Sequence, residues 1–192
     1  LASAEAFCAN CLAAAFSLPL LMPFLIKDNP VFTSPVIQLP ELAPEVRIQS
    51  IHKEVNKGLT FEQAITEAHR CLNCKNPTCV QGCPVNINIP SFIKTLEKGD
   101  ILGAANVIKE SSSLPAVCGR VCPQEKQCEA KCIHLRMGKQ PVAIGYLERF
   151  VADYANAHPS NNSITPQSNG QKIAVVGSGP AGLTFAGDMA KY

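Results

Sequence analysis

The stretch that decides the fold of this 192-residue chain is Cys71-Leu-Asn-Cys74-Lys-Asn-Pro-Thr-Cys79-Val-Gln-Gly-Cys83-Pro84. A second stretch of the same character follows it, Cys118-Gly-Arg-Val-Cys122-Pro-Gln-Glu-Lys-Gln-Cys128-Glu-Ala-Lys-Cys132. Only Cys8 and Cys11 of the ten cysteines lie elsewhere, so the enrichment is local. Clustered cysteines are typical of disulfides, zinc sites or iron–sulfur clusters.

The spacing of these cysteines favours two [4Fe–4S] clusters. Three closely spaced thiolates wrap one cubane, and a following Cys-Pro directs its thiolate to a second cubane, as in two-cluster bacterial ferredoxins. The gaps here differ from the ferredoxin ones. Zinc is the main alternative, but its sites usually combine two C-x-x-C pairs, and within these two groups only Cys71 and Cys74 have that spacing. Disulfides would need an oxidising compartment.

Glu148 is the one non-cysteine candidate ligand. It lies on or beside the apolar stripe of an expected helix, between Leu147 and Val151. Two interpretations stay open from the pattern alone: an ordinary solvated helix residue, or an oxygen ligand that replaces one thiolate.

Helical signals dominate the region around the cysteines. Thr60-Phe-Glu-Gln63 is a capping box, and Phe61, Ala64, Ile65 and Ala68 follow at helical spacing. Further helices are expected after Pro90, ending at Gly99, then from Asp100, and over residues 141–155. We therefore expect a mostly α fold, with a helical iron–sulfur domain over residues 41–155 and a polar linker over 156–171.

The first 40 residues are expected to form a leader or an extended arm. An apolar stretch covers residues 7–26, but Pro19 and Pro23 interrupt it and no basic segment precedes it. A membrane span is therefore not favoured, and we expect a cytoplasmic protein. Cys8 and Cys11 have no partner pair nearby, and their role stays open.

The last residues, 172–192, predict the start of a nucleotide-binding domain. A short apolar run over 172–176 is expected to form a strand of a Rossmann-type α/β domain, here truncated. It leads into the glycine-rich turn, Gly177, Ser178, Gly179, Pro180, Ala181 and Gly182, and then into a helix. Such a turn lets the backbone approach a pyrophosphate at a helix N-terminus. The chain ends ten residues later, so we expect it to be the N-terminal piece of a longer protein.

Residues 45–192 resemble the N-terminal region of the small (beta) subunit of NADPH-dependent glutamate synthase. They are also similar to its relatives, the large subunit of NADH-dependent ferredoxin–NADP oxidoreductase and the N-terminal part of dihydropyrimidine dehydrogenase. The resemblance is carried by Arg70-Cys-Leu-Asn-Cys-Lys-Asn-Pro-Thr-Cys79, Gly82-Cys-Pro-Val-Asn-Ile-Asn-Ile-Pro90, Ala116-Val-Cys-Gly-Arg-Val-Cys-Pro-Gln-Glu125 and Pro141-Val-Ala-Ile-Gly-Tyr-Leu-Glu-Arg-Phe150. It implies one cubane on Cys71, Cys74, Cys79 and Cys132. It implies a second on Cys83, Cys122, Cys128 and Glu148, with Cys118 left over.

The resemblance also implies a function. The glycine-rich turn would bind FAD, a later domain would bind NADPH, and the clusters would relay electrons to a catalytic large subunit or to downstream domains. Two other classes stay open: a stand-alone ferredoxin-like carrier, and a zinc-stabilised interaction module. The net charge of +2 gives no reason to expect a nucleic-acid partner. The sequence does not identify the physiological electron acceptor.

Overall fold

The computed structural model describes residues 35–159 and 167–192. The compact unit discussed below is Val36–Tyr192. The expectations for residues 1–34, including those for Cys8 and Cys11, lie outside the described part of the chain.

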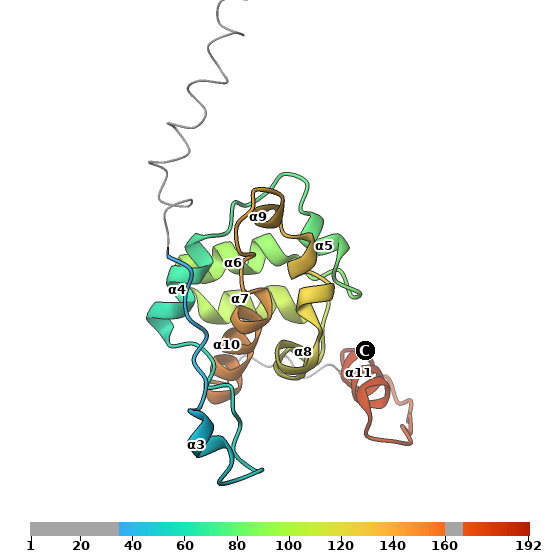
Figure 1. Ribbon diagram of the computed structural model, residues 1–192. Coiled ribbons are helices and arrows are strands. Elements are labelled where there is room, and N and C mark those ends of the chain that lie inside the picture. The colour runs from blue at the N-terminus through green and yellow to red at the C-terminus, as the bar shows by residue number, and fades with distance from the viewer. Residues whose placement is uncertain (1–34, 160–166) are drawn as a thin grey trace, which may run out of the picture. The chain divides into compact units, whose positions relative to one another are not determined.

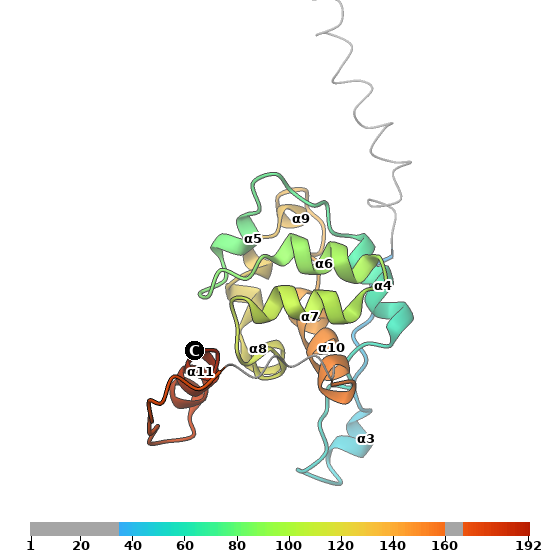
Figure 2. The same ribbon diagram turned by 180° about the vertical axis from the view of Figure 1, so that it is seen from behind.

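The described residues form a helical unit (Figures 1 and 2), as the sequence predicts. In chain order the elements are α3 (Pro44–Arg47), α4 (Phe61–His69), α5 (Thr78–Gln81), α6 (Ile89–Glu97), α7 (Ile101–Lys109), α8 (Pro115–Val121), the 3-10 turns η1 (Gln124–Lys126) and η2 (Glu129–Lys131), α9 (Ile133–Arg136), α10 (Ile144–Ala157) and α11 (Pro180–Met189). The β pairing within the described ranges is an isolated bridge between Glu41 and Asn56. None of the helices in these ranges is long and apolar enough to cross a bilayer.

Helix α4 delivers the first cysteine to the site. Thr60 and Gln63 form the predicted capping box at its start, which satisfies two backbone donors that the helix leaves free. Ala64 and Ala68 are fully buried, whereas Phe61 is 47% exposed. The helix ends at His69, two residues before Cys71, whose amide donates to the Ala68 carbonyl over 3.0 Å.

Helices α6 and α7 lie side by side in both views (Figures 1 and 2). Asn88 caps α6 and Asp100 caps α7 through their side-chain oxygens. Between the helices Gly99 has a φ of +84°, a conformation that glycine adopts without steric cost. The predicted helix stop at Gly99 and the predicted cap at Asp100 are therefore confirmed.

The core is built on α10, which packs against α8, α7 and α4. It begins at Ile144, three residues later than expected, and the segment 140–143 before it is held by Glu67 of α4 and by Arg70. Its buried apolar positions include Leu147 and Val151, both fully enclosed. The same core is closed by large side chains of α6 and α7, namely Phe92, Ile93, Leu96 and Ile108. This packing fixes the positions of the cysteine-bearing segments around it.

The strand predicted over residues 172–176 is not found. These residues lack strand pairing and are mostly exposed, with Val176 99% exposed. A strand needs a neighbouring strand to receive its backbone hydrogen bonds, and the described residues supply none. The turn and helix that follow do form, because α11 is held by its own backbone hydrogen bonds.

Candidate metal centre

Four cysteines from distant parts of the chain line one cavity. Three come from the first group and one from the end of the second; they are Cys71, Cys74, Cys79 and Cys132. Cys71 follows α4, Cys79 lies in α5, and Cys132 caps α9. The structure thus brings together the four residues that were expected to share the first cubane.

The walls of this cavity are mainly apolar. They are formed by side chains of α6, α9 and the start of α10, including Ile89, Pro90, Ile93, Ile133, Val142 and Ile144. Such walls exclude water from whatever the thiols enclose, and solvent exposure is one of the factors that set the potential of an iron–sulfur cluster. We refer to this cavity and its four cysteines as the first site.

The thiols of the first site lie close enough to repel one another's charge. Burial raises the pKa of the Cys79 thiol to about 12, and the charges of Cys71 and Cys132 add to the effect. The pKa of Cys71 is also raised, chiefly by burial. Several buried thiolates are stable together only when cations stand between them, and the iron atoms of a cubane would supply that charge.

A second set gathers the remaining candidates. The pKa of Cys122 is raised to about 11 by burial and then by the charges of Cys118, Glu148 and Cys83. Burial raises the pKa of Cys128 to about 12, with Glu129, Cys83 and Glu148 contributing. These mutual effects place one carboxylate among the thiols of both cysteine groups. We call Cys83, Cys122, Cys128 and Glu148 the second site.

Glu148 is not a solvated helix residue. It is only 7% exposed, and its Oε1 atom is buried without a hydrogen-bond partner among the described residues. Burial raises the pKa of its carboxyl to about 7. An unpartnered buried carboxylate is unfavourable in an apolar setting. A metal ion at this position would satisfy the oxygen, so the donor set fits a cluster with one oxygen ligand.

Cys118 also lies beside the second site. It is one helical turn before Cys122 in α8, and the Cys122 amide donates to its carbonyl over 3.1 Å. Its Sγ atom lies 3.9 Å from the Ser112 hydroxyl oxygen, within hydrogen-bonding distance for sulfur. Cys118 and Glu148 therefore both lie beside the thiols of the second site. The buried, unpartnered oxygen of Glu148 is the observation that favours Glu148 as the eighth ligand.

Two glycines allow the cysteine segments to approach one another. A Cβ atom at Gly82 would lie 2.5 Å from the Gln127 carbonyl oxygen, so the chain before Cys83 touches the chain before Cys128. A Cβ atom at Gly119 would lie 2.6 Å from the backbone nitrogen of Arg149. Neither position stands out in the sequence as a packing glycine, and both were missed by the pattern analysis.

A buried ion pair also escaped the sequence analysis. Glu67 of α4 and Arg70, the residue that follows this helix, are 0% and 3% exposed and form a salt bridge. Arg70 donates to the carbonyl oxygens of Gln140 and Pro141, and Glu67 accepts from the Ala143 amide. The pair therefore ties the end of α4, next to Cys71, to the start of α10. Its signal in the sequence, a Glu and an Arg three residues apart, is indistinguishable from a surface pair.

The ligands do not converge on a point. Within residues 35–159 and 167–192, no three His, Cys, Asp or Glu side chains are gathered as a single bound ion would require. A cubane presents separate iron atoms that each take one ligand, so its ligands surround a volume.

The glycine-rich turn has part of the expected geometry. Gly177 has a φ of +105°, and Gly179 is the N-cap of α11 with Pro180 in its first turn. A Cβ atom at Gly182 would lie 2.3 Å from the Gly177 carbonyl oxygen. Gly177 therefore allows the tight turn, and Gly182 allows the helix to approach that turn closely, as a phosphate-binding turn requires.

Comparison with known proteins gives one family and several relatives. Residues 47–160 match the family described as dihydropyrimidine dehydrogenase domain II, 4Fe-4S cluster. The chain is 39% identical over 152 residues to the glutamate synthase [NADPH] small chain of Halomonas elongata, covering 78% of this chain and 32% of that protein. It is 40% identical over 142 residues to the putative oxidoreductase UacF of Escherichia coli, covering 72% and 22%.

A third relative is named for pyrimidine chemistry. It is the NAD-dependent dihydropyrimidine dehydrogenase subunit PreT of Salmonella typhimurium, 37% identical over 135 residues, which cover 70% of this chain and 32% of that subunit. The chain thus spans about a third or less of the length of these relatives.

Proposed function

Because this chain belongs to the dihydropyrimidine dehydrogenase domain II, 4Fe-4S cluster family, we propose that it is the electron-relay part of an NADPH-dependent flavoprotein oxidoreductase. The first site would hold one [4Fe–4S] cluster and the second site another. The observation that carries this proposal is the single apolar cavity lined by Cys71, Cys74, Cys79 and Cys132.

The chain's own residues would bind, insulate and tune the two clusters. Each cluster supplies reversible one-electron transfer. The thiols of the first site would bind all four irons of one cluster, and the apolar walls would keep water away. In the second site the ligands would be three thiols and the Glu148 carboxylate. A carboxylate is a harder ligand than a thiolate, so the two clusters would differ in potential.

We propose that the relay connects a flavin with a partner. Residues 172–192 would begin the FAD-binding domain, following a linker over 156–171, and their contribution would be the phosphate-contacting turn from Gly177 to Gly182. NADPH would bind elsewhere in a longer protein, and a catalytic large subunit or further domains would exchange electrons with the clusters. The relatives named glutamate synthase small chain and dihydropyrimidine dehydrogenase subunit support this arrangement.

Iron and sulfide analysis of the purified chain tests the proposal. We expect about eight irons and eight sulfides per chain, as two cubanes require, together with broad brown absorption. Cys132→Ser should remove the first cluster and leave the second. A colourless protein that holds zinc would refute the proposal, and so would the loss of both clusters in equal measure from this variant if its fold, followed by circular dichroism, is unchanged.

A further inference from the structure

Helix α6 carries a lysine next to the residues that form a wall of the first site. Pro90 and Ile93 of this helix line the cavity of the first site. Lys94 follows Ile93 in the chain, and it lines an open hollow together with Pro90 and Cys74. A cation and a proposed ligand of the first site therefore border the same hollow.

An ion pair holds the Lys94 ammonium group in place. Its Nζ atom lies 2.5 Å from Oε2 of Glu97, and the two side chains are only 25% and 22% exposed. The other carboxylate oxygen of Glu97, Oε1, lies 2.8 Å from Nδ1 of His69. Burial would raise the pKa of the Glu97 carboxyl, but the hydrogen bonds with Lys94 and His69 outweigh it and lower that pKa. The carboxylate is therefore ionised and held from two sides.

The positive end of this ion pair faces the first site. Lys94 borders the hollow that Cys74 lines, whereas Glu97, nearly one turn further along α6, does not. Burial raises the pKa of the Cys71 thiol, and the Asn73 amide and the charge of Lys94 oppose that rise. The Lys94 charge therefore stabilises the thiolate form of a proposed ligand.

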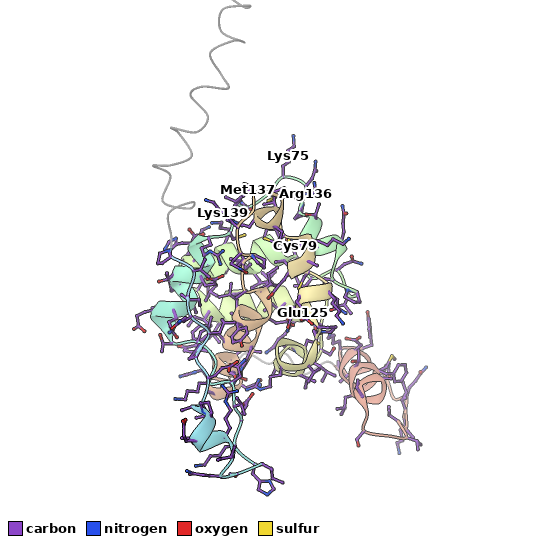
Figure 3. The ribbon with its side chains drawn as sticks, viewed as in Figure 1. Lys75, Cys79, Glu125, Arg136, Met137 and Lys139 are labelled. Atoms are coloured by element: carbon purple, nitrogen blue, oxygen red, sulfur yellow. The ribbon has the colours of Figure 1, made fainter. Side chains whose placement is uncertain are left out.

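Two other lysines border the same hollow, but both are exposed. They are Lys75 and Lys98, and Figure 3 shows the Lys75 side chain pointing away from the loop between α4 and α5. Water and salt screen exposed charges much more than partly buried ones. Among the lysines of this hollow, Lys94 should therefore act most strongly on the first site.

The second site has a different electrostatic setting. No residue of the second site borders the hollow that Lys94 lines. Burial raises the pKa of Cys128, and the negative charges of Glu129 and Glu148 raise it further. We therefore expect the Lys94 charge to act on the first site, and the second site to serve as an internal reference.

We propose that Lys94 sets the reduction potential of the first cluster, because its fixed ammonium group stabilises the reduced cluster more than the oxidised one. Glu97 is the positioning residue that holds this ammonium group. The inference rests on the proposed function. In each transfer the flavin loses one electron and the cluster gains it, so the negative charge of the cluster grows. Net charge and solvent exposure are among the factors that set the potential of an iron–sulfur cluster, and a nearby cation attracts the more negative form more strongly.

The test is an anaerobic redox titration of the cluster-loaded chain, in which electron paramagnetic resonance follows the two clusters separately. Lys94→Met keeps a side chain of similar length and removes the charge. We expect the reduction equilibrium of the first cluster to shift about tenfold towards the oxidised form, which is about 59 mV for a one-electron couple. The potential of the second cluster should stay unchanged. Lys94→Arg keeps the charge and should keep the potential of the unaltered chain.

Two further variants separate the charge of Lys94 from a purely structural role. Lys98→Met removes an exposed lysine from the same hollow, and it should leave both potentials nearly unchanged. Glu97→Gln breaks the same ion pair as Lys94→Met but removes a negative charge instead of a positive one. The potential of the first cluster should therefore rise or stay unchanged in Glu97→Gln.

Two results would overturn the role of Lys94: an unchanged potential of the first cluster in Lys94→Met, or an equal fall in Lys94→Met and Glu97→Gln. If Lys94→Met does not hold the first cluster, the other two variants decide. The proposal then requires an unchanged potential in Lys94→Arg and no fall in Glu97→Gln, and any other result refutes it. Iron content is measured in parallel: an unaltered chain without clusters refutes the proposed function, whereas two clusters that do not respond to Lys94 refute this inference alone.

Discussion

Gly119 of α8 lies directly against the backbone of Arg149 in α10, with room for no side chain between them. A Cβ atom at Gly119 would be 2.6 Å from the Arg149 nitrogen and 2.8 Å from its Cα. Because Gly119 follows Cys118 and Arg149 follows Glu148, this contact determines how closely the α8 cysteines approach the Glu148 carboxylate.

Gly119→Ala should therefore damage the second site. The added methyl group would push α8 away from α10, and overpacking of this kind costs about 1–3 kcal/mol. We expect a lower unfolding temperature and loss of the cluster of the second site, seen as about four fewer irons per chain. Gly179→Ala is the control, because a Cβ atom there meets nothing within 4 Å. A Gly119→Ala protein with full iron content would contradict this account.

Cys118 and Cys128 should differ in their effect on iron content. Cys128 is 8% exposed and belongs to the proposed ligand set, whereas Cys118 lies outside that set and has a hydroxyl neighbour, Ser112. We expect Cys118→Ser to retain about eight irons per chain, as two cubanes require, and Cys128→Ser to lose iron from the second site. Equal losses in the two variants would show that the ligand set is wrong.

Substitutions of Glu148 test the oxygen ligand. Glu148→Ala removes the only oxygen donor of the second site, so we expect that cluster to be lost or weakened while the cluster of the first site is spared. Glu148→Cys should keep the cluster and shift its potential, because a softer thiolate replaces a carboxylate. Electron paramagnetic resonance during a redox titration follows both clusters separately. Unchanged spectra and potentials in Glu148→Ala would make Cys118 the better candidate for the eighth ligand.

Removal of the clusters should make stability depend on the charge of Glu148. Burial raises the pKa of its carboxyl from 4.5 to about 7. A raised pKa means that the folded state binds the proton more tightly than the unfolded state does, so its stabilisation is present below about pH 4.5 and is lost as pH rises towards 7. The effect is on the order of 3 kcal/mol.

The measurement for this prediction is urea unfolding of the cluster-free chain between about pH 5 and pH 8, the range over which the carboxyl ionises. Burial also raises the pKa of Glu129, so part of the slope should remain in any Glu148 variant. Glu148→Gln should remove the part of the pH dependence of the unfolding free energy that comes from the Glu148 carboxyl. An identical pH dependence in Glu148→Gln and in the unaltered chain would show that Glu148 is not held in an apolar setting.

Glu67→Ala should be among the most damaging substitutions outside the cysteines. It leaves the 3% exposed Arg70 without its buried carboxylate, and breaking a buried pair in this way typically costs about 3–5 kcal/mol. It also frees the Ala143 amide. Thermal unfolding of the cluster-loaded protein measures the loss. The exposed Glu110→Ala is the control, and a similar small change in both variants would contradict the structural role.

Much of the local structure could be predicted from the sequence, because its causes are local. The capping box of Thr60 and Gln63 and the cap at Asp100 depend on residues three positions apart, and the reversal at Gly99 depends on its own backbone freedom. The cysteine spacing indicates iron–sulfur chemistry from the sequence alone, because cubane ligands commonly come from short cysteine-rich runs, as in bacterial ferredoxins.

What only the tertiary structure decided concerns groups that are distant in sequence. Packing α4, α8 and α10 together buries Glu148 and forms the cavity that joins Cys132 to Cys71. The same packing brings Glu67 and Arg70 to the backbone of residues 140–143 and Gly119 to the backbone of Arg149. The strand expected over residues 172–176 failed for the same reason. A helix satisfies its hydrogen bonds from its own neighbours in sequence, whereas a strand and a buried charge depend on partners that only the rest of the fold provides.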